Sequence, residues 1–236
     1  MVKKTTIFHQ YLNTMPYFTP DFVSFFQELA QNNNRDWFQA NKPRFEKHVK
    51  QPFAALIQDL INRIEAVDHR VIMTPKDAIF QLHRDVRFSQ DKSPYKTYTS
   101  AIISAGGKKN TTFPGLYLQL NHEQVEVYSG VYMPEKEPLQ KIREHIAANP
   151  EAFSRLVADP VFVEKFGTIR GEVNKRLPKE FEEAAKTQPL IYNKAFYYFD
   201  TLPTSVLFQE DFPDVVMTYF HAAQPMGRFF EAALLS

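Results

Sequence analysis

Residues 83–97, HRDVRFSQDKSPYKT, concentrate side chains that could bind an anion or act as acids and bases. Arginine offers a flat fork of donors that suits a carboxylate or a phosphate, and lysine acts as a mobile point charge. Ser89 and Ser93 add hydroxyls, and the backbone N–H groups of a tight turn can form an anion-binding concavity. The charges of the segment come from Arg84, Arg87, Lys92, Lys96, Asp85 and Asp91.

Positive charge is in excess around this segment. Residues 84–109 hold six basic side chains, Lys108 and Lys109 included, against two acidic ones, which gives a local charge of +4 (six minus two) in a chain of net charge +1. A salt-bridge network uses only as many cations as anions, so the surplus favours an anionic ligand. Asp85 and Asp91 are the candidates for a general base or metal ligand. The predicted ligand-binding residues are Arg84, Arg87, Lys92, Tyr95 and Lys96.

Three functions stay open at this stage. The first is binding, with turnover as an extension, of a phosphorylated small molecule or nucleotide at the basic turn. The second is a protein-interaction module in which Arg84 and Arg87 pair with Asp85 and Asp91 and staple the turn. The third, nucleic-acid binding, is disfavoured by an isoelectric point near 7.9. Tyrosines that could line the neighbouring sheet surface are Tyr95, Tyr98, Tyr117, Tyr128 and Tyr132.

Several chemistries lack their sequence signature. There is no G-x-G, no glycine-rich phosphate loop and no G-x-S-x-G nucleophile elbow. The seven histidines never fall three to five residues apart, and there is no cysteine, so we predict no metal site, no disulfide and no thiol nucleophile. No cofactor can be predicted from the sequence motifs.

Helical periodicity dominates both ends of the sequence. Phe22, Phe25, Phe26 and Leu29 form one apolar stripe of a first helix that Thr19 caps. Asn34 is a plausible cap of a short second helix. A third is expected from Pro43 to about Val67, broken near Pro52. After Pro134 the helical pattern resumes, with further helical segments over 178–187 and 209–235.

The middle of the chain has the period of two that is typical of strands. We predict four sequential strands over about 78–132, the first at 79–87, and another near 195–202. The fold class is therefore α+β, with a central, mostly antiparallel sheet packed by N-terminal and C-terminal helices. We expect a single domain over 1–236, with a boundary near 134 as the alternative.

Composition predicts a soluble cytoplasmic protein. The 44% hydrophobic content is that of a folded chain, no window approaches eighteen consecutive apolar residues, and residues 1–18 show no signal peptide. No membrane partner is expected. The C-terminal stretch from 209 is acidic and could contact the basic turn of another copy, so a homo-oligomer is an open alternative.

The block LHRDVRFSQDKSPYKT resembles the signature of the family called domain of unknown function 2461. The blocks NNNRDWFQANKPRFE, GLYLQL…SGVYMP and VNKRLPKEF are similar to that family's other blocks in the same order, from about Phe22 to Phe230. The resemblance implies one α+β domain of bacterial type and carries over no activity or cofactor. Gln90 and Glu180 depart from the Lys and Gly expected at those positions, and Gln90 dilutes the basic patch.

Overall fold

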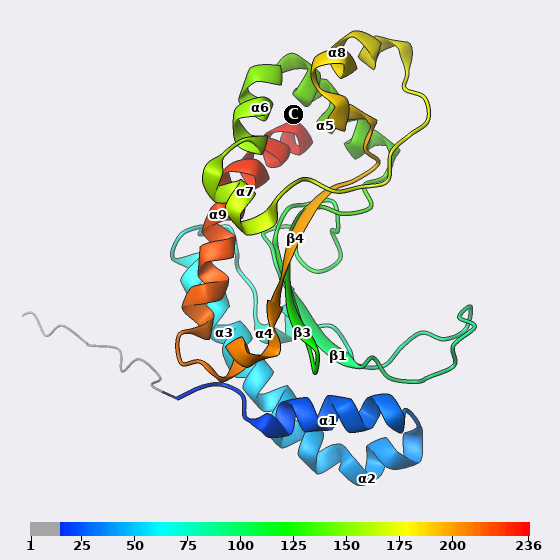
Figure 1. Cartoon of the computed structure of the whole chain (residues 1–236), viewed down its shortest axis with the longest axis vertical. Coiled ribbons are helices and arrows are strands. Elements are labelled where there is room, and N and C mark those ends of the chain that lie inside the picture. The colour runs from blue at the N-terminus through cyan, green and yellow to red at the C-terminus, as the bar shows by residue number, and fades with distance from the viewer. Residues whose placement is uncertain (1–14) are drawn as a thin grey trace, which may run out of the picture.

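The computed structural model describes residues 15–236, and the fold consists of one antiparallel sheet with helices around it (Figure 1). Residues 1–14, on which most of the signal-peptide prediction rests, lie outside the described residues. The strands follow each other in the order in which they occur in the chain. They are β1 (Tyr98–Ile103), β2 (Leu116–Asn121), β3 (Gln124–Val131) and β4 (Phe196–Pro203). The predicted α+β class, with its antiparallel sheet, is confirmed.

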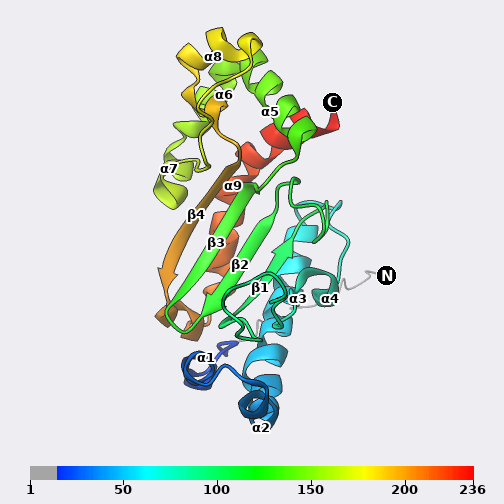
Figure 2. The same cartoon turned by 90° about the vertical axis from the view of Figure 1, so that its right-hand side faces the viewer.

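Alternation along the strands gives the sheet two different faces. Leu118 of β2 lies opposite Val127 of β3, and both are fully buried. Helices α3 (Gln51–Glu65) and α9 (Phe212–Leu235) pack on this apolar face, behind the sheet in Figure 2. The other face, which is turned toward the viewer in Figure 2, is not covered by a helix layer and carries tyrosines. We call it the open face.

The N-terminal helices form as the sequence predicts, with two differences. Helix α1 (Pro20–Gln31) buries the predicted phenylalanine stripe, and the Asn34 side chain caps α2 (Arg35–Phe45) by accepting from Trp37 N at 2.9 Å. Thr19 occupies the N-cap position of α1, but its side chain caps no backbone N–H and donates to Asp21 Oδ2 at 3.3 Å. A π-helical turn (Glu46–Lys50) then joins α2 directly to α3, so no separate helix begins at Pro43. The turn precedes Pro52, whose missing N–H group favours a break at this point.

The C-terminal half adds a second group of helices beyond one end of the sheet (Figure 1). It contains α5 (Lys136–Ala148), α6 (Pro150–Val157), α7 (Pro160–Phe166) and α8 (Glu182–Thr187). Helix α9 contacts α5, α6 and α7 as well as β3, and the buried residues form one core cluster that continues across residue 134. Short 3-10 turns occupy Lys179–Phe181, Pro189–Tyr192 and Thr204–Phe208, and a one-turn helix, α4, spans Pro75–Ala78.

The predicted strand over 79–87 is wrong. Only two isolated antiparallel bridges form there, Ile79 to Ala101 and His83 to Tyr95. The chain leaves the sheet after Phe80 because the charged residues that follow fold back on themselves. The alternation of residues 79–87 therefore belongs to one arm of a projecting hairpin and not to a strand of the sheet.

The acidic C-terminal residues find partners within the same chain. Asp214 pairs with Arg63 at 2.6 Å, and Glu231 pairs with Arg70 at 2.9 Å. The proposed contact of this stretch with another copy is therefore not needed to neutralise these two carboxylates. Within residues 15–236, no helix combines the length and apolar character that crossing a bilayer requires.

Candidate ligand-binding site

Residues 82–96 form a hairpin that projects from the open side of the sheet (Figure 1). Backbone hydrogen bonds close its base: Arg84 N donates to Pro94 O at 2.9 Å, and Lys96 N donates to Leu82 O at 2.8 Å. The Asn33 side chain holds the hairpin against the loop between α1 and α2 through both backbone groups of Tyr95. The hairpin is therefore anchored at its base and free at its tip.

The two arginines of the hairpin are neutralised by its two aspartates. Arg84 forms an ion pair with Asp91 and also donates to Ser93 O at 3.2 Å. Arg87 forms an ion pair with Asp85 at 2.6 Å. Because the four charges cancel in pairs, the arginine forks already hold carboxylates of their own chain and contribute no net positive charge.

The aspartates of the hairpin are weak bases. The hydrogen bond from Arg87 lowers the pKa of Asp85, and hydrogen bonds from Ser93 and then from Arg84 lower the pKa of Asp91. A carboxylate with a lowered pKa holds a proton poorly, so neither group is suited to general-base work near neutral pH. Both carboxylates instead have a structural role, because they pair with the arginines of the hairpin.

The structure brings Arg84, Tyr95 and Lys96 together around an open cavity of about 690 Å³ at the base of the hairpin, which Asp85 and Asp91 also line. The contacts of the remaining predicted residues differ. Lys92 Nζ donates to Val86 O at 3.0 Å and so helps to close the hairpin tip. The Tyr95 ring is 2% exposed and stacks on Phe38 at 4.2 Å between centroids, so its ring belongs to the core. Lys96 alone reaches the open face.

The ammonium group of Lys96 lies between two aromatic rings. Its Nζ is 5.6 Å from the centroid of Phe80 and 5.7 Å from that of Tyr98. In the described part of the chain no carboxylate pairs with it, and burial alone lowers its pKa. Lys108 approaches the same Phe80 ring at 5.8 Å and donates to Ile79 O at 2.8 Å and to Lys76 O. Two cations therefore converge on one ring.

A cavity of about 350 Å³ adjoins Phe80 on the open face. Its lining is mainly apolar and aromatic, with Lys108 and Gln119 as the polar groups most able to orient a ligand. The loop between β1 and β2 forms one side through Thr111 and Phe113. The rings that line the cavity are those of Phe80, Phe113, Tyr117, Tyr128, Tyr132 and Tyr197.

A hydrogen-bonded polar chain runs across the floor of the open face. Tyr117 Oη donates to Gln119 Oε1 at 3.0 Å, Gln119 donates to Glu126, and Tyr128 Oη donates to Glu126 Oε1 at 2.8 Å. Burial raises the pKa of Tyr117 to about 12 and, together with the Glu126 carboxylate, raises that of Tyr128. Both phenols therefore remain protonated donors at neutral pH.

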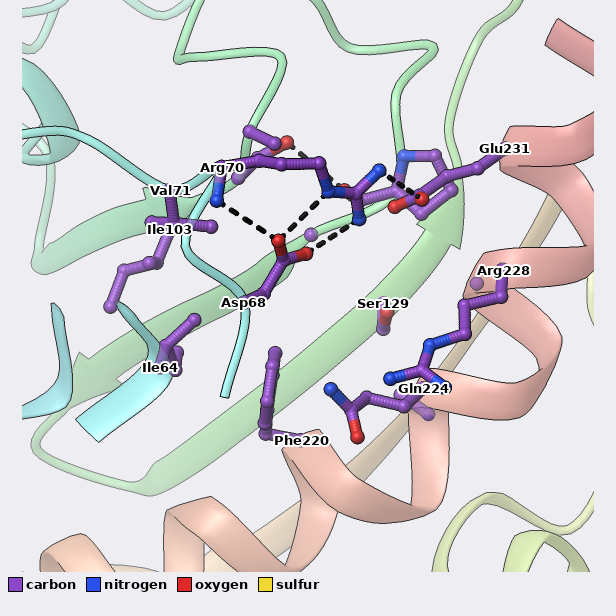
Figure 3. Close-up of a pocket in the computed structure, with 16 residues that line it drawn as sticks. Ile64, Asp68, Arg70, Val71, Ile103, Ser129, Phe220, Gln224, Arg228 and Glu231 are labelled. Carbon is purple, nitrogen blue, oxygen red and sulfur yellow. Dashed lines mark hydrogen bonds and ion pairs between the residues drawn. The ribbon is translucent and has the colours of Figure 1, made fainter. Parts of the chain in front are cut away.

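A second cavity, between α3 and α9, is small and already filled with internal pairs. Its volume is about 50 Å³, enough for little more than water. Figure 3 shows Arg70 between Asp68 and Glu231, with hydrogen bonds to Asp68 at 2.8 and 2.6 Å. This cluster ties the segment after α3 to α9. The cavity at the hairpin base is lined by Arg84 and Asp91, which already pair with each other, so the cavity beside Phe80 is the better ligand site.

Sequence reasoning found part of this site. Four of the five tyrosines expected at the sheet surface lie on or beside the open face, and Lys96 was among the predicted ligands. Phe80, Gln119 and Glu126 were missed. The alternation of Gln119 with buried leucines was a usable signal, whereas the approach of Lys108 to Phe80 depends on a loop whose path the sequence does not reveal.

The comparisons agree with the sequence signature. The family described as "Conserved hypothetical protein (DUF2461)" matches residues 21–229. The chain belongs to this family. No curated protein is similar enough to the chain to count as a match.

The partly buried position of Lys96 predicts a lowered pKa that can be measured. Burial penalises the charged ammonium, so we expect its pKa to lie below the ordinary lysine value of 10.5. Competitive acetylation across pH 7–12, read by mass spectrometry of the peptide that contains Lys96, gives this pKa directly. A midpoint at or above 10.5 would contradict the desolvated position between the two rings.

Proposed function

We propose that this protein binds a nucleotide-type ligand on the open face, with the planar ring in the aromatic cavity and the phosphate beside Lys96 and Lys108. The observation that carries the proposal is the convergence of these two ammonium groups on Phe80. Phe80 and Lys108 line the aromatic cavity, and Lys96 lines the adjoining cavity at the hairpin base. Lys96 has no carboxylate partner in the described residues, and Lys108 donates only to backbone carbonyls. Both can give N–H donors to an anion.

The polarity of the cavity supports a ligand with two unlike ends. Aromatic side chains stack on planar rings of any base, while two lysines compensate a phosphate but offer nothing to an apolar molecule. Inorganic phosphate alone would leave the aromatic cavity empty, and a neutral ring would leave Lys96 without a partner. The proposal concerns binding alone. Such a ligand is consistent with the cytoplasmic location expected from the sequence.

The test compares nucleotides with their nucleosides. The four ribonucleoside 5′-monophosphates, the matching nucleosides and inorganic phosphate are titrated by calorimetry into the wild type and three variants, Lys96→Met, Lys108→Met and Lys92→Met. Each of the first two variants should weaken nucleotide binding about ten-fold, equivalent to about 1.4 kcal/mol, and leave nucleoside binding unchanged. Lys92→Met is the control, because Lys92 serves the hairpin tip.

The proposal is wrong if no nucleotide binds to the folded wild type. It is also wrong if Lys92→Met weakens binding as much as Lys96→Met does, because the phosphate would then lie on the hairpin.

A protein-interaction role for the hairpin is the second candidate, and the exposure of Phe88 favours it. This ring lies at the hairpin tip, is 95% exposed, and has Arg87 at 5.8 Å from its centroid. The two ion pairs of the hairpin do not involve Phe88, so the hairpin tip presents an aromatic ring together with an arginine. Aromatic residues and arginine are the groups that contribute most at protein interfaces.

Substituting Phe88→Ser tests this role. Because the side chain packs against little else, the melting temperature should change by less than about 1 °C. In affinity purification from cell extract, proteins retained by the wild type should be lost from this variant. The control is Ile72→Ser, which removes another apolar side chain that is 85% exposed. Retention of the same proteins by Phe88→Ser would exclude the hairpin tip as their contact.

A further inference from the structure

A row of aromatic rings crosses the whole open face, from the segment before β1 to β4. Phe80 lies 6.0 Å from Tyr117, Tyr117 lies 5.7 Å from Tyr128, and Tyr128 lies 4.5 Å from Phe199, all between ring centroids. The last three residues are cross-strand neighbours in the registers of β2, β3 and β4. The row is therefore built into the strand pairing and extends beyond the cavity.

The far end of this row carries its own cation. The guanidinium carbon of Arg170 lies 4.0 Å from the Phe199 centroid. Two backbone hydrogen bonds, of 2.7 and 3.2 Å, fix Arg170 beside Tyr197 at the outer edge of β4. The side chain is exposed, and within residues 15–236 it forms no ion pair with a carboxylate. Its donors are free to bind an anion that the Lys96 end cannot reach.

Negative charge is almost absent between the two cationic ends. Of the strand residues whose side chains lie on the open face, only Glu126 is charged. This carboxylate is 8% exposed and accepts hydrogen bonds from Gln119 and Tyr128. A polyanion that crosses the row would therefore meet aromatic rings and neutral polar groups, with cations at both ends.

We propose that the open face binds single-stranded nucleic acid across this row. One phosphate contacts Lys96 and Lys108, a phosphate further along the strand contacts Arg170, and unpaired bases stack against exposed ring surfaces between them. The inference rests on the proposed nucleotide site, which becomes one end of a longer site. A mononucleotide reaches only one end, because four rings separate Lys96 from Arg170.

The small net charge of the protein limits the electrostatic contribution to nucleic-acid binding. With a net charge of +1, long-range attraction is small, and the phosphate contacts come from the three cations named above. For single strands the slope of log K against log salt is about −0.7 per neutralised phosphate, so two contacted phosphates give an expected slope of roughly −1.4. A slope of this size separates a defined site from diffuse attraction to a basic surface.

The test uses fluorescence anisotropy with end-labelled eight-nucleotide oligo-U and a labelled duplex of the same length, at 50 to 200 mM salt. The variants are Arg170→Gln, Tyr117→Leu and the control Arg155→Gln, an exposed arginine on α6. Arg170→Gln should weaken oligo-U binding about five- to ten-fold and reduce the salt slope by about 0.7. Tyr117→Leu should weaken it by about five-fold or more. Binding of uridine 5′-monophosphate should be unchanged in Arg170→Gln.

Each alternative result has a separate meaning. Binding of the monophosphate without tighter binding of oligo-U overturns this inference and leaves the nucleotide site intact. Duplex binding equal to that of oligo-U overturns it, because paired bases cannot stack on the rings. Equal losses for Arg155→Gln and Arg170→Gln overturn it as well, since they indicate diffuse attraction. If the monophosphate does not bind and oligo-U does, the nucleotide site is wrong, and the Arg170 comparison alone decides this inference.

Discussion

The two-residue period of strands β2, β3 and β4 is the constraint on which this structure depends. It puts the leucines and valines against α3 and α9, and the same geometry turns Tyr117, Tyr128 and Phe199 to the opposite face. A slip of one residue in the pairing would bury the tyrosines and expose the core, so burial of the apolar side fixes the position of the aromatic side. A further close contact holds β3 against β4. Gly130 has a φ of +97°, and a Cβ at that position would lie 2.2 Å from Phe196 O.

The basic side chains on the open side of the sheet have two kinds of partner, carboxylates and aromatic rings. Within the hairpin each arginine has an aspartate partner, and these pairs shape the turn. Exposed ion pairs of this kind contribute little to stability, so their main effect is to give the hairpin a defined form. Three basic groups without carboxylate partners lie against aromatic rings instead: Lys96 and Lys108 beside Phe80, and Arg170 over Phe199. Cations beside aromatic faces are held in place by the ring electrons yet keep their N–H donors for a ligand.

Much of the fold could be predicted from the sequence, and less of the site. The α1 stripe, the Asn34 cap and the β2–β3 hairpin follow from local periodicity and capping, which are encoded in neighbouring residues. The segment after Phe80 was misread because an alternating pattern of charges can be a strand or a hairpin arm, and only the pairing of Arg84 with Asp91 across the turn decides between them. The same limit affects the site. The surplus positive charge of residues 84–109 was visible, but the position of Lys96 and Lys108 beside Phe80 depends on segments brought together by folding, and so does that of Arg170 over Phe199.

Whether the open face binds a nucleotide can be decided by side-chain NMR of the protein labelled with ¹³C-tyrosine and titrated with uridine 5′-monophosphate. Tyrosines lie on both sides of the sheet, so a tyrosine on the buried side serves as an internal control. If the open face binds the nucleotide, the ring signals of Tyr117 and Tyr128, which line the cavity, shift, and that of Tyr198, which is buried beneath α9, does not. Shifts confined to Tyr95 at the hairpin base, or no shift at saturating nucleotide, would contradict the assignment of the open face as the ligand site.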